Sequence, residues 1–173
     1  CSICGEGLYA PDTALTACMS CPTGTYLSDN ANLASFHDEA DDCVACDSGR
    51  YNDVAGASSC MPCAAGYSAD TTGLSVCSAC AAGTAQAATG QTSCLPCDDG
   101  TYSDASATSC SACGSGKYSG ANASSCLSCQ AGTYSEAGAS VCRACETGKY
   151  NDVAESASCS ACAAGKNASG AGS

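Results

Sequence analysis

Apolar side chains in this chain do not recur at the spacing of about 3.6 residues that an amphipathic helix needs. Glycine or short polar stretches interrupt them every few residues, and glycine recurs too often for stable helices. This pattern predicts short two-stranded β-ribbons and irregular loops, with little helix outside one longer insertion at 22–42. Because no apolar run approaches the ~20 residues of a membrane-spanning helix, we expect no direct membrane insertion of this segment.

A short repeat sets these positions along the whole chain. Cysteines come in Cys-x-x-Cys pairs, and 12 or 13 residues lie between successive pairs, with one exception of 21. Glycine lies three residues after the second cysteine of every pair, and tyrosine follows two residues later in seven of them. A fixed period predicts an array in which each unit mainly contacts its neighbours, here an extended rod of ten units of ~16 residues.

We interpret residues 1–173 as tandem cysteine-rich repeats and expect them to be a fragment of a longer protein. Residues 22–42 form a longer acidic loop insertion, and residues 46–162 are regular repeats. Residues 49–66 and 148–165 are identical at 12 of 18 positions, which indicates that a block of repeats was duplicated.

The composition excludes a conventional aliphatic core. Leu, Ile, Val and Phe account for only 14 of the 173 residues, well below the ~20 % that a packed core normally needs. Cysteine accounts for 20 residues, and cross-links replace the missing core in small secreted domains. We therefore expect a small disulfide-rich array that is extracellular or at the cell surface.

The charge of the chain restricts its partners. The formal net charge is −12, with 17 acidic and five basic residues. No basic stripe is present to neutralise phosphates, so we expect no nucleic-acid partner. An anionic membrane surface is unfavourable for the same reason.

The cysteines are compatible with three chemistries. Structural disulfides are favoured, because each closed loop of about 15 residues contributes ~3 kcal/mol to stability. Pairs of Cys-x-x-Cys also have the spacing of zinc ribbons, and single pairs serve as redox centres on a βαβ scaffold that is not predicted here. The spacing alone leaves two pairings open, a ladder between successive pairs and a crossed pairing within four-cysteine modules.

The motif Cys-x-x-Cys-x-x-Gly-x-Tyr, seen at 18–26, 94–102 and 126–134, resembles the ephrin-receptor-like cysteine-rich repeats. It is also similar to the first half of a tumour-necrosis-factor-receptor repeat. Long arrays of this kind that are rich in Ala, Gly and Ser resemble protist and algal surface proteins, including mastigoneme-like proteins of flagellar hairs. The resemblance implies a spacer rather than a catalytic domain.

The resemblance also implies the ladder, in which the second cysteine of each pair bonds to the first cysteine of the next. Cys1 and Cys162 are then left for units that flank the segment. The expected bonds are Cys4–Cys18, Cys21–Cys43, Cys46–Cys60, Cys63–Cys77, Cys80–Cys94, Cys97–Cys110, Cys113–Cys126, Cys129–Cys142 and Cys145–Cys159.

Few other residues are candidates for chemistry. The single histidine, His37, is expected at the surface, and we predict no catalytic, cofactor-binding or metal-binding residue. The stretch 114–117 resembles a phosphate loop but lacks its first glycine and the Ser or Thr after the lysine. The acidic loop is expected to be solvated, with calcium binding by its carboxylates or a partner contact through Phe36 as alternatives.

Asn122 and Asn167 begin Asn-x-Ser sequons, so we expect both to be glycosylated in a secreted protein. Together these observations predict a non-enzymatic extracellular structural protein, a disulfide-stapled rod in a surface filament, hair or stalk. Its expected partners are other copies of itself or other filament and surface proteins, with glycans attached. The alternative is a ligand-binding or adhesion ectodomain of a cell-surface receptor.

Overall fold

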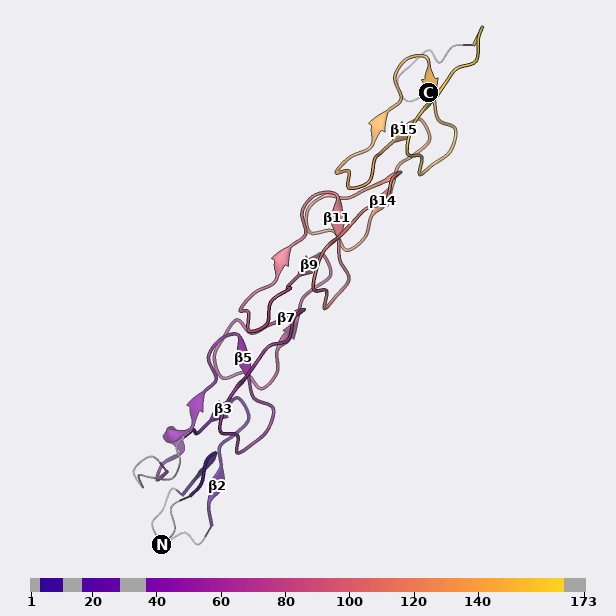
Figure 1. Cartoon of the computed structure of the whole chain (residues 1–173). Helices are drawn as coiled ribbons and strands as arrows, with labels where there is room; N and C mark the ends of the chain where they lie inside the picture. The colour runs from indigo at the N-terminus through magenta and orange to yellow at the C-terminus, as the bar shows by residue number, and fades with distance from the viewer. Residues whose placement is uncertain (1–3, 11–16, 29–36, 167–173) are drawn as a thin grey trace. The chain divides into compact units, whose positions relative to one another are not determined.

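The computed structural model describes residues 4–10, 17–28 and 37–166 (Figure 1). The chain divides into two compact units. One comprises Cys1–Ala79 with Gln86–Cys94, and the other comprises Cys80–Ala85 with Leu95–Ser173. Both are built from the same small repeat.

We define a repeat as the segment from the second cysteine of one pair to the residue before the second cysteine of the next. Each repeat contains one antiparallel pair of two-residue strands. The repeats that the structure describes in whole or in part are 4–20, 21–45, 46–62, 63–79, 80–96, 97–112, 113–128, 129–144 and 145–161.

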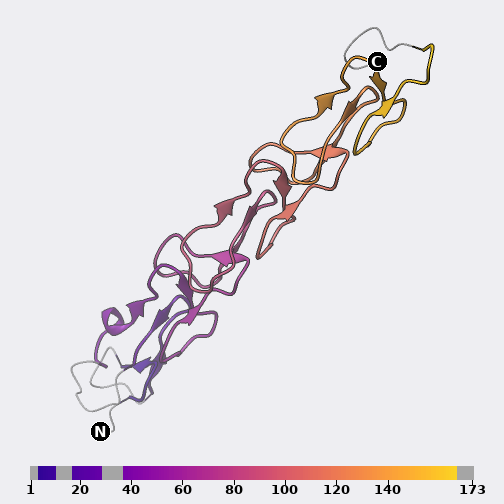
Figure 2. The ribbon, with the colours of Figure 1, turned by 45° about the horizontal axis from the view of Figure 1, so that its top comes forward.

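The first strand of a pair follows the glycine, and the second lies between two cysteines. Figures 1 and 2 show the strands as short arrows along the chain. Tyr9, for example, lies opposite Met19. The pairs are β1 (Leu8–Tyr9) with β2 (Met19–Ser20), β3 (Thr25–Tyr26) with β4 (Val44–Ala45), β5 (Arg50–Tyr51) with β6 (Met61–Pro62), β7 (Tyr67–Ser68) with β8 (Ser78–Ala79), β9 (Thr84–Ala85) with β10 (Leu95–Pro96), β11 (Thr101–Tyr102) with β12 (Ser111–Ala112), β13 (Lys117–Tyr118) with β14 (Leu127–Ser128), β15 (Thr133–Tyr134) with β16 (Arg143–Ala144) and β17 (Lys149–Tyr150) with β18 (Ser160–Ala161).

Helix is almost absent from the described residues. They contain one short 3₁₀-helix, η2 (Ala40–Asp42), in the longer acidic loop. Its first turn is capped by the Asp42 carboxylate, which accepts hydrogen bonds from the N–H groups of Asp38 at 3.2 Å and Glu39 at 3.0 Å. None of the described helical segments is long and apolar enough to cross a bilayer. The predicted fold class, a disulfide-rich repeat array with short ribbons and little helix, is confirmed.

Each ribbon starts from a tight turn, which the glycine at the same position of every repeat makes possible. In repeat 21–45, the N–H of Thr25 donates to the carbonyl of Pro22 at 3.2 Å, and Gly24 has φ of 82°. A positive φ at this third position is what a type II turn requires. The Thr25 hydroxyl donates to the same carbonyl at 2.7 Å and reinforces the turn.

Sulfur and small side chains form the interior in place of aliphatic residues. The second cysteine of every described pair from Cys4 to Cys145 is at most 4 % exposed. Most of the few large apolar side chains lie instead at the surface, including Leu95 at 62 % and Val54 at 61 % exposure. The compositional prediction of a core without aliphatic packing therefore holds in the structure.

A tyrosine ring covers a cross-link most clearly where repeats 4–20 and 21–45 meet. There Tyr9 forms a buried cluster with Cys21 and Leu27, and the partly buried Cys43 packs against it. The ring thus covers the disulfide of the following repeat. Tyr67 and Tyr150 are more exposed, at 37 % and 41 %.

Candidate functional site

The disulfides form a ladder along the chain. In each bond, the second cysteine of one pair joins the first cysteine of the next pair, with Cα atoms 5.6–5.8 Å apart. Cys80 and Cys94 are likewise disulfide-bonded. The other bonds are Cys4–Cys18, Cys21–Cys43, Cys46–Cys60, Cys63–Cys77, Cys97–Cys110, Cys113–Cys126, Cys129–Cys142 and Cys145–Cys159. Sulfur atoms bonded in this way are not available as zinc-binding thiolates.

Three backbone hydrogen bonds hold a buried cysteine and its turn against the neighbouring repeats. In repeat 113–128, the turn glycine, Gly116, donates its N–H to Ser135 and accepts from the N–H of Cys129, both at 2.8 Å. The carbonyl of Cys113 accepts from the N–H of Gly138 in the next repeat at 2.8 Å. The same pattern recurs along both compact units, so each repeat is fixed by its neighbours in sequence.

A repeat also contacts the repeat after the next one. The Cα of Gly116, with φ of 78°, lies against the carbonyl of Glu155, and a Cβ added to Gly116 would collide with that oxygen. Gly7 meets the carbonyl of Gly56 in the same way, two repeats along. The turn glycine is therefore needed both for its φ and for the close approach of another backbone.

A buried polar residue three positions after the turn glycine links adjacent repeats. Its carbonyl accepts the N–H of the preceding turn glycine, and its side chain donates to the carbonyl of the residue just after that glycine. Ser119, for example, accepts from Gly100 at 2.8 Å and donates to Thr101 at 2.9 Å. We call this position the staple residue; it is buried and polar in Asn52, Gln86, Ser103, Ser119, Ser135 and Asn151. The Gln86 side chain is the exception, because it donates to the carbonyl of Ser93 in its own repeat at 2.8 Å.

No role for the staple residue was predicted from the sequence. Ser103, Ser135, Asn52 and Asn151 make the same side-chain hydrogen bond as Ser119, at 2.6–2.9 Å. The signal that could have identified it is the recurrence of Ser or Asn directly after tyrosine, in register with the buried cysteines. Because a buried polar side chain must find a partner, that register points to a contact between repeats.

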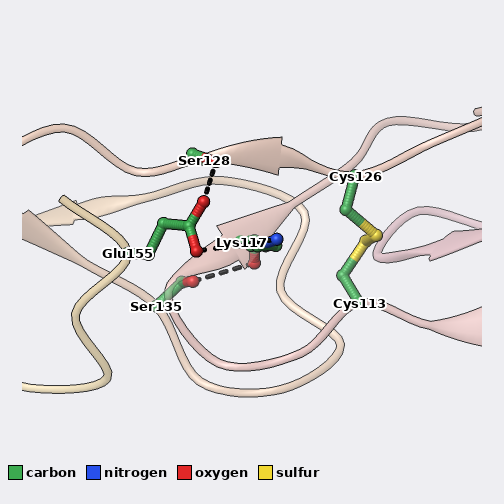
Figure 3. A network of polar contacts seen from close by, with 6 residues as sticks. All are labelled: Cys113, Lys117, Cys126, Ser128, Ser135 and Glu155. Carbon is green, nitrogen blue, oxygen red and sulfur yellow. Dashed lines mark hydrogen bonds and ion pairs between the residues drawn. A yellow bond between two sulfur atoms is a disulfide. The ribbon is translucent and has the colours of Figure 1, made fainter.

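A surface network reinforces the contact between repeats 113–128 and 145–161 (Figure 3). The Glu155 carboxylate accepts a hydrogen bond from Ser128 at 2.6 Å and lies 3.6 Å from the Lys117 ammonium. These contacts lower the pKa of Glu155, the Ser128 hydrogen bond more than the Lys117 charge. The staple hydroxyl of Ser135 donates to the carbonyl of Lys117 at 2.8 Å beside them.

A second ion pair lies within the turn of repeat 145–161. The Lys149 ammonium donates to the Glu146 carboxylate at 2.9 Å. This hydrogen bond, with the attraction between the charges, lowers the pKa of Glu146 and raises the pKa of Lys149. Both side chains are exposed, so the pair contributes little to stability.

The prediction for His37 is wrong. We expected a surface histidine, but its side chain is only 3 % exposed. The ring Nδ1 lies 2.7 Å from the carbonyl of Leu8, and the His37 carbonyl accepts the N–H of Ala10 at 2.7 Å. The end of the long loop folds back onto the first described repeat, and this backbone pairing buries the imidazole.

The remaining predicted residues lie at the surface or outside the described residues. Asn122 is exposed, and Cys162 is a free, partly buried cysteine. The acidic residues Asp38, Glu39 and Asp41 are exposed, as expected for a solvated loop. Cys1, Asn167 and Phe36 lie outside the described residues.

The described residues bring together no set of three or more His, Cys, Asp or Glu side chains that could hold a metal ion. The stretch 114–117 forms the ordinary turn of its repeat: the N–H of Lys117 donates to Gly114 at 3.1 Å and that of Gly116 to Ser135. These N–H groups are thus engaged by backbone carbonyls. What the arrangement can do is cross-link and stack repeats.

The comparisons with known proteins agree with this geometry. The family described as tyrosine-protein kinase ephrin type A/B receptor-like matches residues 34–74 and 132–173. These two segments of the chain are thus similar to ephrin-receptor-like repeats. The matched segments lie in different parts of the array, and the other repeats have the same disulfide, turn and ribbon. No curated protein matches the chain.

Repeats of this kind are typically non-catalytic. Their dense disulfides are characteristic of oxidising compartments. The disulfide ladder and the ephrin-receptor-like repeats together indicate an extracellular or cell-surface location.

Proposed function

We propose that this chain is a structural segment of an extracellular protein, a disulfide-stapled rod within a surface filament, hair or stalk. The observation that carries the proposal is the pattern of contacts in each compact unit. Backbone hydrogen bonds between repeats connect each repeat with the next one, and the turn glycines reach the repeat after that. Such a pattern can be continued without limit, because each added repeat meets the same neighbours.

The mechanical role follows from the ladder. Tension along the chain passes through the disulfide of each repeat and the two residues between paired cysteines, and it bypasses the loop that the disulfide closes. The Cys113–Cys126 bond spans 13 residues and holds the two Cα atoms 5.7 Å apart. A free chain of that length extends to roughly 45 Å, so each such bond withholds about 40 Å of extension.

Single-molecule stretching tests this role. In oxidised protein we expect no extension steps of this size, because the loops are closed. After addition of a reductant, steps of about 40 Å should appear as single bonds are cleaved. The Cys21–Cys43 bond, with a sequence separation of 22, should give one step of about 70 Å. Steps of 40 Å without reductant would contradict a continuous load-bearing ladder.

Imaging of native material tests the assembly itself. We expect negative-stain images to show thin fibres or stalks, in which the chain associates with further copies or with other filament and surface proteins. Isolated compact particles without fibres or stalks would contradict the structural role.

The net charge of −12 is unfavourable for binding nucleic acid, so we propose no such partner.

A second candidate function is a ligand-binding or adhesion ectodomain. It is favoured by the match to a family described by its likeness to ephrin type A/B receptors, and by the longer loop at 22–42, which interrupts the regular repeats. Capture of a specific partner by the intact chain, lost on deletion of residues 28–42 but retained when an equal length is removed from the C-terminal repeat, would favour the ectodomain over the rod.

A further inference from the structure

Asn122 occupies a distinctive position in its repeat. It has φ of 59°, and the equivalent residues in other repeats also have positive φ: they are glycine at Gly56, Gly73, Gly90 and Gly138, and Ser106 and Glu155 elsewhere. Asparagine is among the few residues that tolerate this left-handed conformation. The backbone at this position therefore resembles that of the other repeats, while the side chain adds an amide that they lack.

The backbone of the Asn122 sequon faces the preceding repeats. The N–H of Asn122 donates to the carbonyl of Cys97 at 2.9 Å, and the carbonyl of Ala123 accepts from the N–H of Ser103 at 3.2 Å. The Asn122 carbonyl lies against the Cα of Gly83, where a Cβ would collide with it.

The side chains of the sequon face outward. Asn122 and Ser124 are both exposed, as are their neighbours Ala121 and Ser125. The packed backbone and the exposed side chains together leave room for a large group on the Asn122 amide without disturbing a contact between repeats.

We propose that Asn122 carries an N-linked glycan and that the glycan is attached before repeat 113–128 folds; this inference rests on the proposed extracellular function. In the attachment step, the amide nitrogen of Asn122 attacks the anomeric carbon of a lipid-diphosphate-linked oligosaccharide. A carbon–nitrogen bond forms, the bond from that carbon to the diphosphate oxygen breaks, and the amide proton passes to a base of the transferase. Ser124 completes the recognised sequon.

The timing follows from the hydrogen bonds of the sequon. A transferase must enclose the Asn-x-Ser segment, but in the folded repeat its backbone is engaged by Cys97 and Ser103 and packed on Gly83. The unfolded chain offers the same segment freely. Once the repeat folds, the glycan lies on the solvent side and covers part of the surface beside the ladder.

To test this, the chain is expressed in a eukaryotic secretory host, and every variant including the parent carries N167Q. Any N-glycan at a sequon must then be at Asn122. N122G preserves the backbone, because glycine occupies the equivalent position in other repeats. S124A removes the sequon without changing Asn122, and S125A is the matched control one residue outside it. N-glycosidase treatment should lower the mass of the parent and of S125A by the mass of one N-glycan. It should leave the masses of N122G and S124A unchanged.

Peptide mapping after glycosidase should find aspartate at position 122. If the secreted protein is fully oxidised and Asn122 is unmodified, the glycan proposal fails while the extracellular function stands. If native material carries free thiols throughout, both fail. For the timing, a transferase supplied with the lipid-linked donor should modify reduced, unfolded, unglycosylated protein and leave the oxidised protein unmodified; equal modification of both would overturn it.

Discussion

Repeats 46–62 and 145–161 are similar in sequence, and their staple residues make the same contacts. In the first, the Asn52 side chain donates to the carbonyl of Thr25 at 2.6 Å and accepts from the N–H of Val54 at 3.0 Å. In the second, Asn151 makes the equivalent contacts to Thr133 at 2.8 Å and Val153 at 3.0 Å. The shared motif therefore builds the same local structure in two different compact units.

The copies differ at the left-handed loop position, which is Gly56 in one and Glu155 in the other, with φ of 77° and 60°. In both, the backbone N–H donates to the buried cysteine of the preceding repeat at 2.8–2.9 Å. Glu155 adds the contacts to Ser128 and Lys117 that Gly56 cannot make. The comparison shows that the backbone contact is common to the repeats, while the side chain at this position is free to vary.

Removing a disulfide should have the largest effect and should affect both copies alike. Cys46–Cys60 and Cys145–Cys159 each span 14 residues. Replacing either pair by alanine should lower the free energy of opening of that repeat by about 3 kcal/mol. Native-state hydrogen exchange of amides in the affected repeat measures this, with a distant repeat as the control. Unchanged protection in either copy would contradict a structural role for its bond.

Substitution of the turn glycines that meet the two loop positions should have the next largest effect. G7A and G116A each force a positive φ on alanine and drive its Cβ into the carbonyl of Gly56 or Glu155. We expect a loss of about 2–3 kcal/mol in thermal or denaturant unfolding.

The matched control for these variants is G138A, because Gly138 also has a positive φ but has no atom within 4 Å of an added Cβ. It should retain the backbone strain and lack the collision. If G138A and G116A lose the same free energy of unfolding, then the close approach of the Glu155 carbonyl to Gly116 does not add to the cost of the substitution.

The staple residues should come third. N52A and N151A each leave a carbonyl of the preceding repeat, that of Thr25 or Thr133, without its side-chain donor. The expected loss is about 1–2 kcal/mol for each. N52S and N151S should lose less, since serine fills this role in Ser103, Ser119 and Ser135. If serine and alanine variants melt at the same temperature, the staple hydrogen bond is unimportant.

Exchanging the variable loop residue should have the smallest effect, and its sign should depend on pH. E155G relieves the left-handed conformation but removes the contacts to Ser128 and Lys117. Because the pKa of Glu155 is lowered in the folded protein, its carboxylate stabilises the fold above the pKa of the unfolded chain, near 4.3. This contribution is lost as pH falls through the lower folded pKa.

Thermal melting of parent and E155G across this pH range measures that contribution. The stability of the parent relative to E155G should decrease below about pH 4 and on addition of salt, which screens exposed charges. In the reciprocal variant, G56E, the new carboxylate has no lysine opposite it, because Leu8 occupies the position equivalent to Lys117. A constant difference between parent and E155G at all pH values would contradict a charged contact at Glu155.

Much of this architecture could be predicted from residue spacing. The turn glycine and the cysteine period specify the short ribbons, because they restrict the chain to turns with positive φ at fixed intervals. The spacing itself allowed ladder and crossed pairings, and the structure has the ladder, as in Cys113–Cys126.

The contacts between repeats could not be read from the sequence. The staple residues were visible as a recurring Ser or Asn, but their partners lie 18–27 residues away in the chain. The recurrence after tyrosine points to a contact between repeats, but it does not identify the partner carbonyl. His37 was misplaced for a related reason: its burial depends on how the long loop returns to the β1 segment, which hydrophobic pattern alone does not determine.

The ladder also decides what a broken peptide bond does to the molecule. A cut after Lys117 or Lys149 lies inside a loop whose two ends are still joined through sulfur, so the array stays in one piece. A cut after Arg143, between Cys142 and Cys145, has no such bypass and divides the array there. Proteolytic cleavage after Arg50, Lys117 or Lys149 would therefore leave the array in one piece until the disulfides are reduced. This resistance is useful for material exposed outside a cell.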